Sequence, residues 1–257
     1  MEQGSKTSTV KSIFRAANVL NCISEGQNSL TEIAESCELS KSTVHRLLQT
    51  LVESGIVVQD PISRKYFVGK LITRLLSRPQ VTHEHLIVCA EKEMTILSEK
   101  TRETISLGIM LGLKYISLKE VPSRYQLRVV EAETDMQGPL HAGAGGKVLL
   151  AQLNDQELQI ALDNLHFRAI TPFTITDKQK AYAQISQIRH RGYAESTDEV
   201  VMGAMCIAVP VKGYSLPACL SIIGPTHRMQ DKKLQYRKML QESASRISKK
   251  IAGVREK

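Results

Sequence analysis

Three amphipathic segments open the chain. From about Val10 to Ser24 the apolar residues recur every three or four positions, which predicts an amphipathic helix. Ser29 precedes Glu32 by three residues, the spacing of a capping box, so a short second helix is expected to begin there. After a brief break, Ser40 can cap a third helix that has one apolar stripe and one polar face.

A strand pattern follows the third helix. The apolar run at 56–58 and the segment Lys65-Tyr66-Phe67-Val68 flank the turn sequence Asp60-Pro61-Ile62-Ser63, and together they predict a small β-hairpin. A capped helix, a short turn, a second helix with a polar outer face and a hairpin are the elements of a winged helix-turn-helix. We therefore expect a winged helix-turn-helix at residues 1–69.

A helical linker is expected next. Apolar residues keep a helical spacing over about 70–78, stop at Pro79 and resume from about 82 to 100. Such a segment suits a connection between domains and a surface that faces a second copy of the chain. The linker is therefore assigned to residues 70–101, and a second domain to residues 102–257.

The second domain begins with short apolar runs that are typical of strands, at 105–110, 115–121 and 127–130. Two more such runs, 206–211 and 218–223, come late in the chain. Helical periodicity is found at 148–153, 155–162, 178–191 and 231–252. Strands grouped early and late, with helices between them, predict an α+β fold rather than a doubly wound parallel sheet.

Composition narrows the class of protein. The net charge of +8 favours an anionic partner. The N-terminus lacks the basic and apolar regions of a secretion signal, and no segment approaches about 20 apolar residues, so we expect a cytoplasmic protein with no membrane partner. The five cysteines include no C-x-x-C pair, which fits neither a disulfide framework nor a zinc site. We expect reduced thiols, no metal and no cofactor.

The third predicted helix carries the candidate DNA contacts. Residues 39–50 include basic side chains and no acid. Arg46 can offer two parallel donors to a guanine edge, and Gln49 can pair with adenine. The alternative is an ordinary three-helix domain whose surface helix carries charge without binding DNA. The predicted contacts are Ser40, Lys41, Ser42, Thr43, His45, Arg46, Gln49 and Thr50 in the helix, and Arg64 and Lys65 in the hairpin.

Several motifs resemble one family. The segment LTEIAESCELSKSTVHRLLQTLVESGIVVQD, followed by RKYFVGKLI, resembles the winged helix-turn-helix of the IclR family of bacterial regulators. GPLHAGAGGKVLLAQL, IRHRGYAESTDEVVMGAMCIAVPV and ACLSIIGPTHRM are similar to its effector-binding domain, in the same order. The resemblance implies a GAF-like α+β effector domain, a homodimer that can pair into a tetramer, an operator in double-stranded DNA, repression of a catabolic operon, and a small organic-acid or sugar-acid effector.

A loop of small residues, His141 to Lys147, opens a predicted helix, and its free backbone N–H groups could cradle the carboxylate of an anionic effector. The alternative is a tight turn that only packs the helix on the sheet. The resemblance adds pocket positions, and it also shows departures from the family pattern at Ser196 and Ile223. The predicted effector contacts are Leu140, His141, Ala144, Gly145, Gly146, Asp198, Glu199, Cys206 and Ser221.

Two other classes of protein compete with a regulator. Cys206, His141 and Asp198 could form the nucleophile, base and orienting group of a thiol enzyme. The sequence shows no nucleophile motif around Cys206, so we expect no enzyme. A purely architectural protein is the other alternative, but residues 102–257 are more than dimerisation needs. Operator binding that responds to a metabolite distinguishes the regulator from both.

Overall fold

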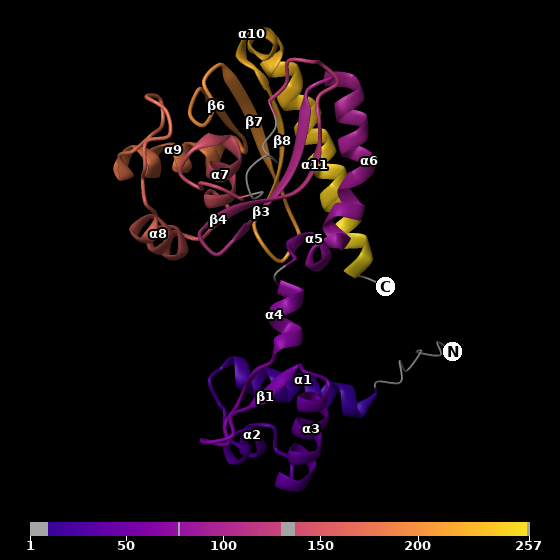
Figure 1. Ribbon diagram of the computed structural model, residues 1–257. Coiled ribbons are helices and arrows are strands. Elements are labelled where there is room, and N and C mark those ends of the chain that lie inside the picture. The colour runs from indigo at the N-terminus through magenta and orange to yellow at the C-terminus, as the bar shows by residue number, and fades with distance from the viewer. Residues whose placement is uncertain (1–9, 77, 130–136, 256–257) are drawn as a thin grey trace, which may run out of the picture. The chain divides into compact units, whose positions relative to one another are not determined.

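The computed structural model describes residues 10–76, 78–129 and 137–255 (Figure 1). The chain divides into two compact units, Met1–Thr82 and His83–Lys257. This division falls inside the segment expected as a linker, so part of that segment belongs to each unit.

The first unit has the predicted helices and hairpin. Ser29 and Glu32 form the expected capping box, in which the Ser29 hydroxyl accepts from the Glu32 N–H and the Glu32 carboxylate accepts from the Ser29 N–H. The two strands of the hairpin are antiparallel, with Val58 opposite Phe67. The elements are α1 (Lys11–Ser24), α2 (Leu30–Ser36), α3 (Lys41–Glu53), β1 (Val57–Gln59), β2 (Tyr66–Val68), α4 (Lys70–Leu76) and α5 (Pro79–Thr82).

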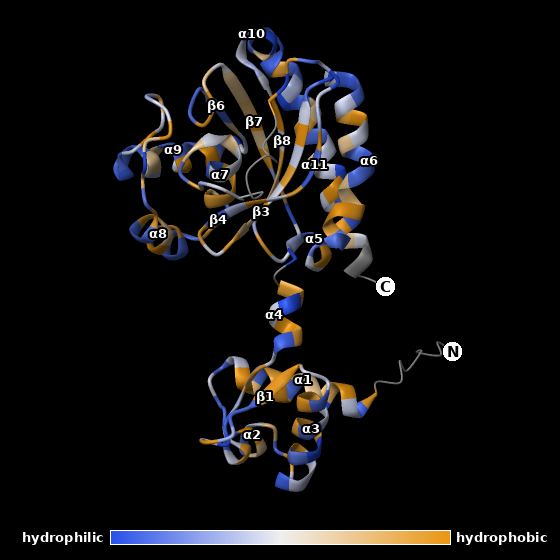
Figure 2. Ribbon diagram, in the orientation of Figure 1, coloured by the Kyte–Doolittle hydropathy of each residue, from blue (hydrophilic) through white to orange (hydrophobic). Residues whose placement is uncertain are grey.

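The core of the first unit explains how α3 is oriented. Val44 and Leu48, one turn apart on α3, are fully buried and belong to one cluster with Val19 of α1 and Ile33 of α2. The opposite face of α3 is therefore left to solvent. α4 differs, because none of its residues is buried, and Figure 2 shows both hydrophobic and hydrophilic turns along it.

The second unit is built on a six-stranded antiparallel sheet in the order β5-β4-β3-β8-β7-β6. The central strands are long and apolar, and every residue of β8 is buried. Because both faces of the sheet are covered, these strands carry continuous apolar runs. The strands are β3 (Thr104–Leu111), β4 (Lys114–Val121), β5 (Gln137–Gly138), β6 (Ala194–Thr197), β7 (Ala204–Val211) and β8 (Ala218–Pro225).

Helices cover the two faces of this sheet separately (Figure 1). On one face α6 and α11 pack against the sheet through buried residues such as Leu86 and Leu240. On the other face a second cluster, with Leu149, Leu158 and Ile185, joins three helices to the sheet. The helices are α6 (Glu84–Thr101), α7 (Gly143–Leu150), α8 (Asp155–Asn164), α9 (Lys178–Arg191), α10 (Thr226–Met229) and α11 (Lys233–Arg255), with a 3₁₀ turn η1 (Gln230–Lys232).

The α+β class is confirmed, and three details differ from the prediction. The strand expected at 127–130 is absent from residues 127–129, and residue 130 lies outside the described residues. The two edge strands were not predicted, because β5 has only two residues and the β6 sequence Ala-Glu-Ser-Thr has no apolar alternation. The helix expected at 148 begins five residues earlier, at Gly143. No helix in the described part of the chain is long and apolar enough to cross a membrane.

Candidate functional site

The start of α3 presents a cluster of hydroxyl groups. Ser40 caps the helix, since its Oγ accepts a hydrogen bond from the Thr43 N–H at 3.3 Å. The same oxygen contacts the hydroxyls of Ser42 at 3.1 Å and Thr43 at 2.9 Å. Hydroxyls and N–H groups at a helix N-terminus are groups that contact DNA phosphates.

The predicted DNA contacts of α3 lie on its solvent face. Arg46 and Gln49 are exposed and one turn apart, whereas Val44 and Leu48 point into the core. Thr43 is half-buried, and the Thr50 hydroxyl donates to the backbone carbonyl of Arg46 at 3.1 Å. The remaining exposed residues of this face are Ser40, Lys41, Ser42, His45 and Thr50.

The hairpin turn is held by Asp60. Its carboxylate accepts from the hydroxyl of Ser63 at 2.5 Å and from the N–H of Ser63 at 2.6 Å, and these two hydrogen bonds lower the pKa of Asp60. Arg64 adopts a left-handed backbone with φ of 60°, and its N–H donates to the Asp60 carbonyl at 2.9 Å. Arg64 and Lys65 are exposed, as DNA contacts require. The turn is thus fixed by local bonds while the two basic side chains stay available.

A cavity of about 300 Å³ lies in the second unit beside the start of α7. This volume is at the small end of ligand sites, which suits a compact molecule. Apolar and small residues form most of its wall, and the polar groups come from Tyr115, Ser117, Ser196, Glu199 and Cys206. The cavity therefore combines an apolar surface with a few groups that can fix the orientation of a ligand.

Five of the predicted effector contacts line this cavity, namely Ala144, Gly145, Gly146, Glu199 and Cys206. Sequence reasoning missed Ser117, Val200 and Val201, and it named Ser196 only as a departure from the family pattern, not as an effector contact. Ser117 carried no local signal, because it stands in no recognisable motif. The six-stranded sheet brings Ser117 of β4 and Ser196 of β6 to the same cavity, although these two strands are far apart in the sequence.

Leu140 and His141 lie outside the lining of the cavity. Leu140 is fully buried in the apolar cluster between the sheet and its helices. The Nε2 atom of His141 is 2.9 Å from the carbonyl oxygen of Arg168, and its ring packs on Phe167 with 5.3 Å between centroids. Both residues thus support the loop from behind.

Asp198 and Ser221 also lie outside the cavity lining. Asp198 has a left-handed backbone with φ of 61°, and its carboxylate accepts from the Gly203 N–H at 2.6 Å, which closes the loop between β6 and β7. Ser221 is fully buried beneath Gly145, and its hydroxyl has no hydrogen-bond partner among the described residues. The position of a Cβ on Gly145 is 3.6 Å from this hydroxyl.

The start of α7 corrects the expectation of free N–H groups. The Gly143 N–H donates to Glu199 at 3.1 Å, and the Ala144 N–H donates to the hydroxyl of Ser196 at 2.9 Å. Two of the first-turn donors are therefore already used by side chains. Close packing explains why residue 146 is a glycine, because a Cβ at this position would lie 2.6 Å from the carbonyl oxygen of Leu140.

A buried ion pair stands behind the cavity. The Lys147 ammonium donates to Glu199 at 2.5 Å and to Gln184 at 2.9 Å. The side chains of Lys147 and Glu199 are 1% and 9% exposed. Burial lowers the pKa of Lys147, and Glu199 opposes this shift by favouring the charged ammonium. The Glu199 carboxylate therefore binds two donors, the Lys147 ammonium and the Gly143 N–H, and it also lines the cavity.

Two of the residues suggested for a thiol enzyme, His141 and Asp198, form hydrogen bonds with backbone groups. His141 contacts a backbone carbonyl, and Asp198 accepts from a backbone N–H, so neither is oriented by the other. The described residues also hold no group of three His, Cys, Asp or Glu side chains that could bind a metal ion.

The sequence matches two family profiles that together span most of the chain. Residues 12–61 match the IclR helix-turn-helix domain, and residues 79–249 match the C-terminal domain of the bacterial transcriptional regulator IclR. The chain belongs to the IclR family of bacterial transcriptional regulators. The resemblance read from the motifs is thereby confirmed, and a family of regulators gives the thiol-enzyme alternative no support.

Relatives of known name cover nearly the whole chain. The HTH-type transcriptional regulator KdgR of Escherichia coli strain K12 is 34% identical over 244 residues, which are 93% of this chain and 92% of KdgR. The transcriptional repressor IclR of the same organism is 26% identical, over 97% of this chain and 93% of that protein. The crystal structure of the Thermotoga maritima IclR shares the fold, with a TM-score of 0.62, 26% identity and coverage of 95% and 99%.

Proposed function

We propose that this member of the IclR family is a homodimeric repressor that binds an operator through α3 and the hairpin and is controlled by a small organic-acid or sugar-acid effector. The observation that carries the proposal is the exposed face of the first part of α3, residues 41–50, which is basic, free of acids and preceded by a cluster of hydroxyls. Repression is the role stated in the name of the E. coli IclR relative.

Each predicted DNA contact has a separate role in this proposal. Arg46 and Gln49 read base edges in the major groove, because bidentate side chains distinguish base pairs there. Lys41, Arg64 and Lys65 contact phosphates, which position the protein without reading sequence. Binding to a chromosomal operator places the protein in the cytoplasm.

Exposed apolar side chains support a homodimer. Val10, just before α1, is 56% exposed, Ile13 and Phe14 on α1 are 68% and 59% exposed, and Leu75 and Leu76 on α4 are also exposed. A run of large apolar residues on a helix surface marks an interaction site. A two-fold dimer would present two copies of α3 to a palindromic operator, because the symmetry of the protein imposes that of the site.

The cavity favours a compact effector that carries hydroxyl groups as well as a carboxylate. The Glu199 carboxylate and the hydroxyls of Ser117 and Ser196 can accept hydrogen bonds from ligand hydroxyls. Because Lys147 is already paired with Glu199, the effector carboxylate would be bound by neutral donors, and the N–H of Gly145, which lines the cavity, is one candidate on α7. Such a site selects its ligand through hydrogen bonds that a wrong ligand leaves unmade.

The test combines operator selection with a panel of organic and sugar acids. Duplexes recovered from a random pool by the full chain are titrated by fluorescence anisotropy with and without each acid, using the parent, Val201→Trp and Met202→Trp. Val201 lines the cavity and is 47% exposed, whereas its neighbour Met202 is 58% exposed and does not line it.

We expect at least one acid to change operator affinity in the parent and in Met202→Trp but not in Val201→Trp. Recovery of no preferred sequence would contradict the DNA-binding part of the proposal. An acid that acts equally on all three proteins would contradict the assignment of the cavity.

A further inference from the structure

One wall of the cavity stands on irregular backbone. Residues 122–129 follow β4 and contain neither helix nor strand, yet Val129 lines the cavity. Because such a segment has no ladder of backbone hydrogen bonds, its position depends on its contacts with side chains of other elements. The position of Val129 therefore depends on what holds this segment.

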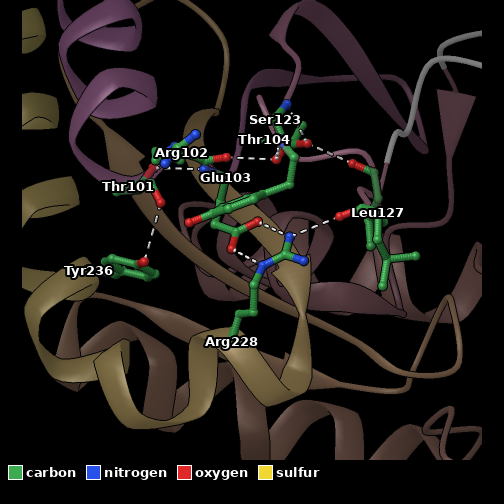
Figure 3. Close-up of polar contacts among 10 residues, drawn as sticks. Thr101, Arg102, Glu103, Thr104, Ser123, Leu127, Arg228 and Tyr236 are labelled. Carbon is green, nitrogen blue, oxygen red and sulfur yellow. Dashed lines mark hydrogen bonds and ion pairs between the residues drawn. The ribbon is translucent and has the colours of Figure 1, made fainter.

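Side chains from two other elements hold the segment by its carbonyl groups (Figure 3). The Thr104 hydroxyl of β3 donates to the carbonyl of Val129 at 2.7 Å. The Nη2 atom of Arg228, on α10, donates to the carbonyl of Leu127 at 3.0 Å. The guanidinium of Arg228 also lies 4.3 Å from the centre of the Tyr125 ring, within cation–π distance.

Arg228 is itself held in one orientation by a bidentate pair. Its Nε and Nη2 atoms each donate to a different oxygen of Glu103 at 2.7 Å. The Glu103 side chain is 1% exposed, and a Cβ on Gly224 would lie only 2.5 Å from one of its oxygens. A planar guanidinium bound at two points has little freedom to turn, so the direction of its bond to Leu127 is fixed.

We propose that Arg228 is a positioning residue for the cavity: oriented by Glu103, it holds the Leu127 carbonyl and so keeps Val129 in the wall. Loss of the pair releases residues 122–129 and opens the cavity, while the rest of the unit keeps its structure. The consequence for effector affinity rests on the proposed function, but the closure of the wall does not.

The variant Glu103→Gln/Arg228→Gln tests this role. Removal of Arg228 alone would leave a buried carboxylate without a partner, which can unfold a protein, whereas the double variant removes both charges and keeps the size of residue 103. Arg124→Gln is the matched control. Arg124 lies in the same segment, but its side chain is 59% exposed and pairs with exposed Glu99 at 3.6 Å.

Two measurements report on the wall directly in the full chain. The first is the rate at which iodoacetamide alkylates Cys206, which lines the cavity, resolved from the other cysteines by peptide mass. The second is amide hydrogen exchange of residues 122–129. In the double variant we expect both rates to rise roughly ten- to a hundredfold, the factor for losing one hydrogen bond to a charged group. Exchange in β7 and the rates in Arg124→Gln should match the parent.

Parent-like rates in a folded double variant would overturn the proposal, because Thr104 and the backbone would then suffice to hold the wall. A uniform rise of exchange across the second unit would also overturn it, since the pair would then only stabilise the fold. Neither measurement uses DNA or an effector, so failure here is distinguishable from failure of the proposed function.

Discussion

Glu199→Gln removes the counter-charge of a buried ammonium without changing the size of the side chain. The Lys147 side chain is 1% exposed, so its charge cannot turn to water when the carboxylate is lost. The new amide has one acceptor oxygen for two donors, the Lys147 ammonium and the Gly143 N–H. Breaking one side of a buried ion pair costs about 3–5 kcal/mol, and we expect a loss of this size in the free energy of unfolding.

The assay is urea unfolding of the full chain, followed by hydrogen exchange of peptides from α7 and β7 so that the second unit is measured by itself. Glu91→Gln is the control, because Glu91 also pairs with a lysine, Lys119, but is 57% exposed. An exposed pair contributes about 0–1 kcal/mol, so the control should lose no more than that.

The double variant Lys147→Met/Glu199→Gln separates buried charge from packing. With no charge left, it should recover most of the stability that Glu199→Gln loses. A loss in Glu199→Gln as small as that of Glu91→Gln would refute the reasoning, since the ammonium would then be hydrated or neutral. Equal losses in the single and double variants would refute it as well, because packing would then explain the effect.

Three further outcomes follow from the same contacts. Burial lowers the pKa of Lys147 in the folded protein, so between the lowered and the usual lysine pKa the unfolded chain binds more protons than the folded chain. The free energy of unfolding should therefore rise with pH across that window, and more steeply in Glu199→Gln. Unfolding at several pH values measures this. Gly146→Ala should lower the melting temperature of the second unit, because the new Cβ would lie 2.6 Å from the Leu140 carbonyl oxygen. Gly192→Ala is the control for backbone strain alone, because Gly192 has a φ of 73° but no atom within 4 Å of the new Cβ. Lys65→Ala should weaken binding to all DNA sequences alike and reduce the salt slope by about 1, as measured by anisotropy at several salt concentrations.

Local signals made the first unit predictable. The capping box at Ser29 and the cap at Ser40 lie within three residues of their partners, so the sequence showed where α2 and α3 begin. The apolar stripe with Val44 and Leu48 then determined which face of α3 is exposed. Every step of that inference used residues on the same or adjacent helices.

The cavity depends on contacts between residues far apart in the sequence, and these could be predicted only in part. The glycine run at 143–146 is a local feature and was found. The bonds from this loop to Ser196 and Glu199 span 52 and 56 residues, so no spacing rule could reveal that they occupy its N–H groups. The run at 127–130 suggested a strand, but the side chains of Thr104 and Arg228 bind the backbone carbonyls of Val129 and Leu127 instead.

The most direct test of operator reading is the affinity of the parent and of Arg46→Ala for a selected operator and for a scrambled duplex of equal length, by anisotropy at a fixed salt concentration. The parent should prefer the operator by roughly a thousandfold or more. Arg46→Ala should lose about 1–3 kcal/mol on the operator and little on the scrambled duplex, because a bidentate base contact is made only with the correct base. A parent that binds both duplexes equally would contradict sequence-specific regulation by α3, and equal losses on both would make Arg46 a phosphate contact.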